Sequence, residues 1–330
     1  MQEVPLIRVR YAHRFAATLE RLGHVSGAFL RRAHLTPEIL RVNDGFMPVN
    51  QLYRFLEDII SATGLVDLGL DAGIHRRREH SEFSRDIAAK PTLNQSLQTL
   101  CTNSKVEDAT AKFHIATDRQ NTWLCCGRIA AGIEAARQIE LYRYAALIEI
   151  IRQSAGPNWL PPIVRFQSVY DERIGGARLL DKVSAQFSSS ELAIAIPNKH
   201  LGKTPRPITL RTEGYSPELA PIAEKSFKTA VKEVIRTHML AGHADVGQVA
   251  FAIGIAARSL QRKLSQCGTS FSCLLRETRI ETAQLRLNQD HVTLQDIAIE
   301  LGYQHSTHFS RAFKKACGVS PREFRTASQR

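Results

Sequence analysis

Apolar residues in the last third of the 330-residue chain recur at helical spacing, and the same pattern occurs twice. The two copies, offset by 48 residues, are "DVGQVAFAIG" at 245–254 and "TLQDIAIELG" at 293–302. Each copy ends on a glycine, Gly254 or Gly302, which favours a tight left-handed turn because glycine has no Cβ. The pattern therefore predicts a short helix in each copy, ended by its glycine.

A residue that can cap a helix stands at the start of each copy. Asp245 and Thr293 are good N-cap residues because their side-chain oxygens accept hydrogen bonds from free backbone N–H groups. Three positions later come Gln248 and Asp296, which resembles a capping box, although a full match would have Glu or Gln at 296. We expect both helices to begin at these caps.

A second helix with an apolar side and a polar side is predicted after each glycine. The apolar side consists of Leu260 and Leu264 in the first copy and of Phe309, Ala312 and Phe313 in the second. The polar side consists of Arg258, Gln261, Arg262 and Ser265 in the first copy and of Thr307, Ser310, Arg311 and Lys314 in the second. Related tetrapeptides, "CGTS" at 267–270 and "CGVS" at 317–320, then end both copies.

A helix, a tight glycine turn and a helix with a polar outer face form the pattern of a helix-turn-helix unit. The connector at 272–290 carries Ile280, Ala283 and Leu287 on one side, so we expect a rigid helix there. Such a helix would place two recognition helices about one DNA turn, roughly 34 Å, apart. The alternative is a helical bundle whose arginines are only solvated, but a bundle does not require a tandem repeat with both polar faces kept.

The first two thirds of the chain change from helical to strand-like periodicity after about residue 105. Strands are expected at 111–117 and 122–129, as a hairpin, and at 162–168, 182–187 and 191–197, with a long helix at 135–156. The predicted fold is an α+β N-terminal domain with a small sheet, followed by an all-α C-terminal domain with two helix-turn-helix units joined by a linker helix.

Prolines and polar turns indicate where the two domains meet. The segment from 197 to 221 contains five prolines, and a helix with Phe227, Val231 and Val234 on its inner side is expected after it. The expected boundaries are an N-terminal domain at 1–196, a linker at 197–221 and a C-terminal domain at 222–330, with the two units at about 245–267 and 293–317.

The net charge of +12 is distributed unevenly. From residue 226 onward, 15 Lys and Arg stand against 8 Asp and Glu, which favours a polyanionic partner but falls short of the basicity of a structural nucleoid protein. The longest apolar stretches, such as 144–151, are shorter than the roughly 18 residues that span a bilayer. The N-terminus lacks the pattern of a secretory signal, so we expect a cytoplasmic protein that does not contact membranes.

The cysteines and histidines do not predict a metal or any other cofactor. Six cysteines, Cys101, Cys125, Cys126, Cys267, Cys273 and Cys317, form no Cys-x-x-Cys pair and no metal-ligand spacing with histidine, and we expect them to be reduced. His305 and His308 form a His-x-x-His pair without a third ligand nearby in the sequence.

With these motifs, the last hundred residues resemble the AraC/XylS family of bacterial transcriptional regulators. The second unit, "IAIELGYQHSTHFSRAFKKACGVSPREFR", follows the family signature almost end to end. The first, "GIAARSLQRKLSQCGTSFSCLLRETRIETA", resembles the variant found in members with an arabinose-binding-type N-terminal regulatory domain, and residues from about 10 to 200 are compatible with that domain.

The resemblance implies that the second helix of each unit enters the major groove of double-stranded promoter DNA. Carried over by position, the residues that read or brace bases are Arg258, Gln261 and Arg262 in the first unit and Ser306, Thr307 and Arg311 in the second. Arg on guanine and Gln on adenine each give about 1–3 kcal/mol of discrimination, whereas Ser and Thr are ambiguous and leave shape-based readout open. Phosphate contacts are assigned to Lys263, Lys314, Lys315 and Arg322, with surface solvation as the alternative for each.

The resemblance also implies that the N-terminal domain senses a small-molecule effector, forms a homodimer, or does both, and that an activator would contact RNA polymerase. The effector site is not identified: Trp123, Tyr142 and Tyr144 could line a pocket, but core packing is the commoner role of such residues. The segment "HRRREH" at 75–80 indicates a solvated turn, with an anionic effector or DNA phosphate as the alternative.

No catalytic constellation is present in the sequence, so we expect a regulator and not an enzyme. The alternative is a DNA-binding module fused to a cysteine-dependent DNA-repair alkyltransferase with Cys125 or Cys126 as the nucleophile. A reactive thiol requires a base or a positive field beside it, and neither cysteine lies in a Pro-Cys-His setting.

Overall fold

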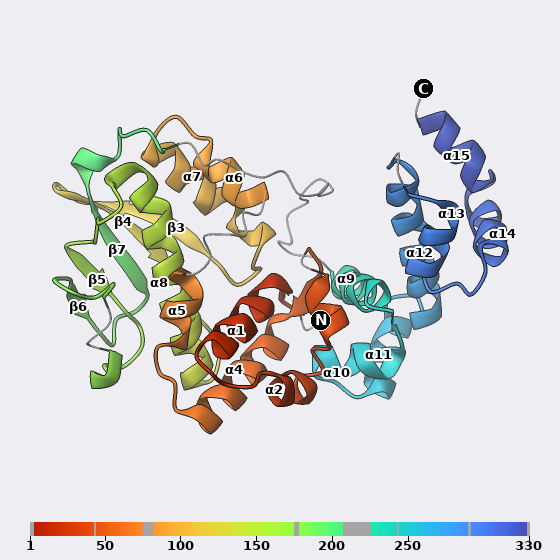
Figure 1. Cartoon of the computed structure of the whole chain (residues 1–330), viewed down its shortest axis with the longest axis horizontal. Coiled ribbons are helices and arrows are strands. Elements are labelled where there is room, and N and C mark those ends of the chain that lie inside the picture. Colours follow the sequence, from red (N-terminus) through yellow and green to blue (C-terminus); the bar gives the residue numbers. More distant parts are fainter. Residues whose placement is uncertain are drawn as a thin grey trace.

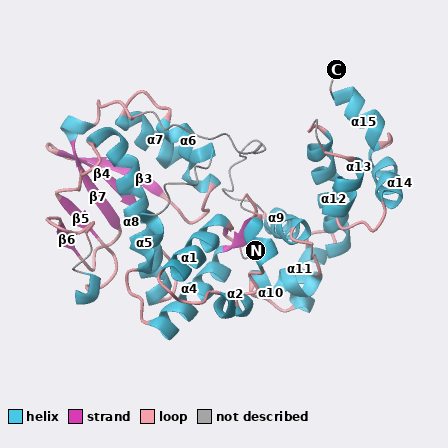
Figure 2. Ribbon diagram, viewed as in Figure 1, coloured by secondary structure: helices cyan, strands magenta, loops and turns pink. Residues whose placement is uncertain are grey.

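The computed structural model describes residues 3–42, 44–74, 82–174, 178–206, 226–242, 244–289 and 292–328. A first part contains the larger sheet and the elements up to β7, and a helical part contains the elements from α9 onward (Figure 1, Figure 2). The N-terminus lies beside α9 and α10 of the helical part (Figure 1). Among the described residues, no helix is both long and apolar enough to cross a bilayer.

Short helices precede the larger sheet, as the helical periodicity up to about residue 105 predicts. They are α1 (Arg10–Arg21), α2 (Gly27–Arg32), α3 (Pro37–Arg41), α4 (Val49–Thr63), α5 (Leu68–Ile74), α6 (Glu82–Ala88) and α7 (Leu93–Asn103). Two short strands, β1 (Leu6–Arg8) and β2 (Phe46–Pro48), pair with each other among these helices and were not predicted.

The larger sheet has the strand order β3-β4-β7-β5-β6. Its strands are β3 (Phe113–Thr117), β4 (Asn121–Cys126), β5 (Ile163–Arg165), β6 (Ser184–Gln186) and β7 (Leu192–Pro197), and α8 (Ile133–Ala155) lies between β4 and β5 in the chain. β3 and β4 form the predicted antiparallel hairpin, and only the β5–β6 pair among the described strands is parallel. The predicted mixed domain with a small sheet is confirmed.

Alternation of side chains gives this sheet two different faces. Leu124, Val164 and Ile194 face α8 and belong to one core cluster with Tyr144 and other residues of that helix. The opposite face carries a small cluster of Trp123, Cys125, Ala193, Ala195 and Ile163, to which no described helix contributes. One face of the sheet is therefore covered by helices, and no helix among the described residues contributes to the cluster on the other.

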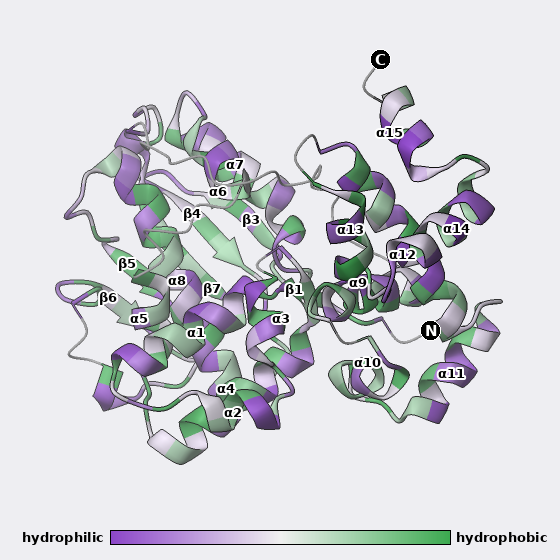
Figure 3. Ribbon diagram, turned by 45° about the vertical axis from the view of Figure 1, so that its right-hand side comes forward, coloured by the Kyte–Doolittle hydropathy of each residue, from purple (hydrophilic) through white to green (hydrophobic). Residues whose placement is uncertain are grey.

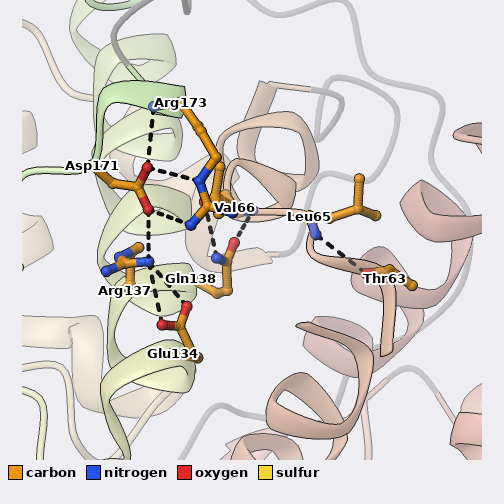
Figure 4. A network of polar contacts seen from close by, with 9 residues as sticks. Thr63, Leu65, Val66, Glu134, Arg137, Gln138, Asp171 and Arg173 are labelled. Carbon is orange, nitrogen blue, oxygen red and sulfur yellow. Dashed lines mark hydrogen bonds and ion pairs between the residues drawn. The ribbon is translucent and has the colours of Figure 1, made fainter. Parts of the chain in front are cut away.

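α5 and α8 pack with their backbones in close contact. A Cβ atom at Gly69 would lie 2.1 Å from the carbonyl oxygen of Gln138, and one at Gly73 would lie 2.5 Å from Cβ of Ala145. The fully buried Gln138 side chain accepts a hydrogen bond from the Gly69 N–H at 2.8 Å and donates one to the Val66 carbonyl at 3.0 Å (Figure 4). Glycines one helical turn apart therefore set the spacing of the two helices.

Ion pairs fasten the N-terminal end of α8 to a distant segment of the chain (Figure 4). Arg137 donates to Glu134 at 3.0 Å on its own helix and to Asp171 at 3.3 Å. Asp171 also accepts from Arg173 at 2.7 Å. The segment after β5 is thereby held against α8.

The helical part begins with α9 (Phe227–Leu240), whose N-cap is Ser226; residues 222–225 of the expected helix lie outside the described residues. It continues with α10 (Val246–Ile253), α11 (Ala257–Gln266), α12 (Phe271–Leu287), α13 (Leu294–Glu300), α14 (Ser306–Cys317) and α15 (Pro321–Ser328). α10–α11 and α13–α14 form two helix pairs, with α12 between them in the chain.

The β1–β2 pair joins the two parts of the molecule. Ile7 and Met47, which are opposite each other in the register, enter the core around α1 and α4. Leu6 and Phe46 instead enter the core formed by α9, α10, α11 and α12. The prediction of an uninterrupted helical region was wrong here, because alternation over three residues is too short to be told from a helical pattern.

The predicted linker at 197–221 lies only partly within the described residues. Its first residues are bonded to the first part, since Asn94 N–H donates to the Leu201 carbonyl at 3.0 Å and Arg206 N–H donates to the Gln153 carbonyl at 3.0 Å. The packed chain therefore continues to at least Arg206. Residues 207–221 and the basic segment at 75–80 lie outside the described residues.

Candidate nucleic-acid interface

Both helix pairs begin with side-chain caps, as the sequence predicts. Asp245 accepts hydrogen bonds from the N–H groups of Gly247 at 2.8 Å and Gln248 at 3.0 Å. Asp296 N–H donates to Thr293 Oγ1 at 3.1 Å, and Thr293 N–H donates to Asp296 Oδ2 at 3.2 Å. The second cap is a reciprocal capping box in which Asp performs the role of the usual Glu or Gln.

The turns inside the two pairs have the same construction. Gly254 and Gly302 have φ angles of 85° and 76°, the left-handed region that a residue with a Cβ rarely adopts. The next N–H in each copy folds back, from Ile255 to the Ala250 carbonyl at 3.0 Å and from Tyr303 to the Ala298 carbonyl at 2.9 Å. The 48-residue repeat in the sequence thus corresponds to a repeat in backbone geometry.

The inner faces of α11 and α14 are buried as predicted, except that Ala312 is only half-buried. Leu260 and Leu264 are fully buried in the core that also contains β1 and β2 residues. Phe309 and Phe313 are fully buried in a second core with residues from α9, α12 and α13. Each second helix therefore has one fixed side, and its other side is left for solvent or a ligand.

The outer faces of both helices are accessible. Arg258, Gln261, Arg262 and Ser265 of α11 are exposed, as are Thr307, Arg311, Lys314 and Lys315 of α14 and Arg322 of α15. Hydrophilic residues lie along both helices, which are on the side of the molecule away from the larger sheet (Figure 3). Neither predicted face is buried against the protein.

The basic residues of the helical part fall into two groups. Arg279 donates to the Leu301 carbonyl at 2.9 Å, Arg325 to the Val292 carbonyl at 2.6 Å, and Arg286 pairs with Glu300, so these cations hold the fold. By contrast, the side chains of Arg258, Arg262, Arg311, Lys315 and Arg322 form no hydrogen bond or ion pair to any residue in the described ranges. Their charge is therefore not neutralised by any group in the part of the chain that the structure describes.

Two of the predicted contact residues differ from the others in position. Ser306 is half-buried at the first position of α14. The Lys263 ammonium lies 5.4 Å from the centre of the Phe227 ring and lines a cleft between the two parts of the molecule. Its position in the sequence indicated a phosphate contact, but its side chain turns toward α9.

The first helix pair is attached to the first part of the molecule by specific contacts. Thr237 Oγ1 of α9 accepts a hydrogen bond from the Phe46 N–H at 2.8 Å and donates one to the Phe46 carbonyl at 2.9 Å. Phe251 of α10 stacks on His34 with ring centres 3.7 Å apart. Arg54 of α4 donates to the Phe251 carbonyl at 3.2 Å. We use the name "dock" for these contacts together with the burial of Leu6 and Phe46 in the helical part.

A cleft of about 660 Å³ adjoins the dock. One wall includes Tyr53, Arg54 and Arg128, and the other includes Phe227, Ile255 and Lys263. A ligand in this cleft would touch both parts of the molecule. Among the described residues, the core of the second helix pair contains none from the first part, so the dock described here involves one pair directly.

The surroundings of the cysteines and of the aromatic residues singled out in the sequence are those of structural residues. All six cysteines are free thiols. Burial raises the pKa of Cys125 to about 12 and also raises the pKa of Cys126, so neither has the thiolate character of an activated nucleophile. Tyr142 and Tyr144 are core residues, and Tyr144 donates to the Leu179 carbonyl at 2.6 Å.

His305 and His308 lie with ring centres 5.6 Å apart. Within the described residues, no Cys, His, Asp or Glu side chain joins them to complete a three-ligand metal site.

Comparisons with known proteins agree with both halves of the sequence interpretation. A family described as the N-terminal arabinose-binding domain of AraC transcription regulators matches residues 23–203, and a family described as a helix-turn-helix domain matches residues 249–327. The first match alone covers more than half of the chain.

Individual relatives match to different extents. An uncharacterised HTH-type transcriptional regulator of Mycobacterium tuberculosis is 40% identical over 76 residues, which are 23% of this chain and only 22% of that protein. The HTH-type transcriptional regulator VirS of Mycobacterium tuberculosis is 24% identical over 335 residues, covering 97% of this chain and 96% of VirS. The crystal structure of the transcriptional regulator CdpR from Pseudomonas aeruginosa covers 91% of this chain and 96% of CdpR, with 16% identity and a TM-score of 0.39.

Proposed function

Because the chain belongs to the AraC family of transcription regulators, we propose that it binds double-stranded promoter DNA through two helix-turn-helix units, α10–α11 and α13–α14. α11 and α14 are the recognition helices, and α12 is the rigid connector that sets their spacing. The observation that carries the proposal is the exposed outer face of each second helix, with arginines whose charge no described protein group neutralises.

Base readout is assigned to the exposed polar residues near the start of each recognition helix. Arg258, Gln261 and Arg262 act in the first groove segment, because Arg forms paired hydrogen bonds with guanine and Gln with adenine. Thr307 and Arg311, with the half-buried Ser306, act in the second.

Phosphate contacts are assigned to basic residues beside these faces. Lys314, Lys315 and Arg322 are exposed on α14 and α15, where they would add affinity without sequence preference. Lys263 is the weaker assignment, because its ammonium lies over Phe227.

The first part acts as a regulatory domain that controls the first unit through the dock. A small-molecule effector in the adjoining cleft would favour one arrangement of the two parts, and only a difference in its affinity for the two arrangements can shift their populations. A homodimer formed by this domain, and a contact with RNA polymerase in the case of an activator, remain predictions from the family.

The experiment begins with DNA fragments that the full-length protein selects from the genome of its host. We expect Arg262→Ala to weaken binding to the selected site by about 1–3 kcal/mol and to relax its base preference at one position. Lys315→Ala should weaken binding to all sequences alike. It should also reduce the slope of log affinity against log salt concentration by about one, because one phosphate contact is lost.

Arg119→Ala is the matched control, because Arg119 is an exposed arginine at the turn between β3 and β4, remote in the sequence from both units. It should bind every fragment as the parent protein does. Unchanged affinity and base preference in the Arg262 variant, with the fold intact, would show that α11 does not read DNA.

A further inference from the structure

Outside the candidate DNA interface, three side chains of metal-binding type meet on the open face of the larger sheet. His114 of β3, Cys125 of β4 and Glu191, the residue before β7, place a ring nitrogen, a sulfur and a carboxylate oxygen within 4.8 Å of one another. His114 Nε2 lies 3.5 Å from Glu191 Oε1. None of the three has a role in the proposed function.

The register of the sheet fixes this arrangement. His114 and Cys125 are direct partners in the β3–β4 ladder, and Cys125 is opposite Ala193 in the β4–β7 ladder. Glu191 lies two residues before Ala193, so its side chain is on the same face as that of Ala193. Direct partners and diagonal neighbours on one face are close enough for their side chains to interact. His114 and Cys125 are therefore held by paired backbone, and Glu191 is positioned by the start of β7 directly after it.

The three groups form a shallow site with an open side. The Cys125 residue is 4% exposed, whereas the side chains of His114 and Glu191 are 54% and 29% exposed. The sulfur lies at the floor, and the nitrogen and the oxygen lie at the rim. An ion held there would keep one coordination position directed to solvent.

The chemistry of these ligands selects a class of ion. Thiolate, imidazole and carboxylate together are ligands of Zn²⁺, which accepts three protein groups and a water in a tetrahedral site. A thiolate and a carboxylate supply two negative charges for a divalent cation. Arg165, which lies 4.2 Å from the centre of the Trp123 ring on the same face, contributes one opposing charge.

We propose that His114, Cys125 and Glu191 form a binding site for Zn²⁺, with water as the fourth ligand. The Cys125 thiol releases its proton to solvent when the sulfur binds the ion, and no group is oxidised or reduced. The inference stands independently of DNA binding. The competing account is a hydrogen-bonded surface cluster with no affinity for metals.

Titration of the reduced, metal-free full-length protein with Co²⁺ distinguishes the two accounts. Co²⁺ replaces Zn²⁺ in such sites and gives a near-ultraviolet charge-transfer band only when a thiolate binds it. We expect this band at one equivalent of Co²⁺, and we expect an equivalent of Zn²⁺ to remove it. Absence of the band at one equivalent would overturn the proposal.

Variants assign the ligands. Cys125→Ser should abolish the band, and a band that persists in this variant would also overturn the proposal. His114→Ala and Glu191→Gln should each weaken Co²⁺ binding by at least about tenfold. Loss of a residue that only hydrogen-bonds to a metal ligand already weakens metal binding by about that factor. Both residues lie at the surface, so these two variants remain informative if the cysteine variant does not fold. Cys101→Ser, which changes a partly exposed thiol on α7, is the matched control and should keep the band.

A second readout does not depend on the thiolate band. The chain has two tryptophans, and Trp159→Phe leaves only Trp123, two residues from Cys125 on the same face of the sheet. Co²⁺ bound at the site should quench the emission of Trp123 with the same stoichiometry as the band. Unquenched emission at saturation would place the bound ion elsewhere and refute the assignment.

Discussion

Replacement of Thr237 by Val tests whether the dock holds the two parts of the molecule together. The side chain keeps its branched shape, but the hydroxyl that accepts from the Phe46 N–H at 2.8 Å and donates to its carbonyl at 2.9 Å is lost. Removing one partner of a buried hydrogen bond costs about 1–3 kcal/mol, because the remaining group stays out of water. A middle value of about 2 kcal/mol corresponds to a roughly 30-fold weaker docking equilibrium.

Hydrogen exchange measures this change at the dock itself. We expect the amides of residues 44–47 to exchange about 30-fold faster in Thr237→Val, with much smaller changes around Tyr144 in the core of the first part. Thr278→Val is the matched control, because Thr278 is also buried but its hydroxyl donates only to the Leu274 carbonyl of its own helix, at 2.7 Å. Equal exchange in the parent and Thr237 variants would refute the energetic role given to this contact.

Two further predictions concern the first part. Gly69→Ala should lower the melting temperature, because its Cβ would lie 2.1 Å from the Gln138 carbonyl oxygen. Overpacking typically costs about 1–3 kcal/mol, and each kcal/mol lowers the melting temperature by about 2–4 °C. Gly202→Ala, with open space around it, should leave the melting temperature unchanged, and equal melting temperatures for the two variants would argue against the close approach. A hydrogen bond from Trp123 Nε1 lowers the pKa of Asp118 from its ordinary 3.8. The ionised Asp118 carboxylate therefore stabilises the β3–β4 turn above pH 3.8, and this stabilisation is lost as the pH falls through the lowered pKa. Emission of a variant with Trp123 as its only tryptophan should report this acid transition, and Asp118→Asn should remove it.

The parts of the fold that were predictable from sequence depend on local signals. The caps at Asp245 and Thr293 and the turns at Gly254 and Gly302 each require one of a few residue types at one position, so a repeat of such residues reveals a repeat of structure. Strands β3 and β4 were visible for a similar reason, since alternation over five or six residues is distinct from a helical pattern.

Features that depend on long-range contacts were not predictable. Lys263 follows the pattern of a solvent-facing residue on α11, and only the packing of α9 places the Phe227 ring beside it. The metal-binding cluster was missed because its residues are 11 and 66 positions apart and meet only through the strand register. Ligand spacing within one segment, which is what a sequence displays, does not detect such a site.

The position of α9 explains how a dock on one unit can affect both. Thr237 bonds to β2, and Val231 and Val234 of the same helix belong to the core of the first unit. Met239, two residues beyond Thr237, belongs to the core of the second unit together with Phe309. One helix therefore contacts the first part and the cores of both helix pairs within a few turns.

A rigid helix with these three sets of contacts cannot move against β2 without moving both units. Close-packed cores shift between discrete arrangements and do not deform gradually, so a small displacement at the dock would reorient α11 and α14 together. Surface ion pairs between α9 and α12, such as Arg236 with Glu281 at 3.2 Å, add little to this coupling because exposed pairs contribute at most about 1 kcal/mol. Under the proposed function, the apolar contacts of α9 are thus the physical route by which an effector in the cleft would change the orientation of α11 and α14 together.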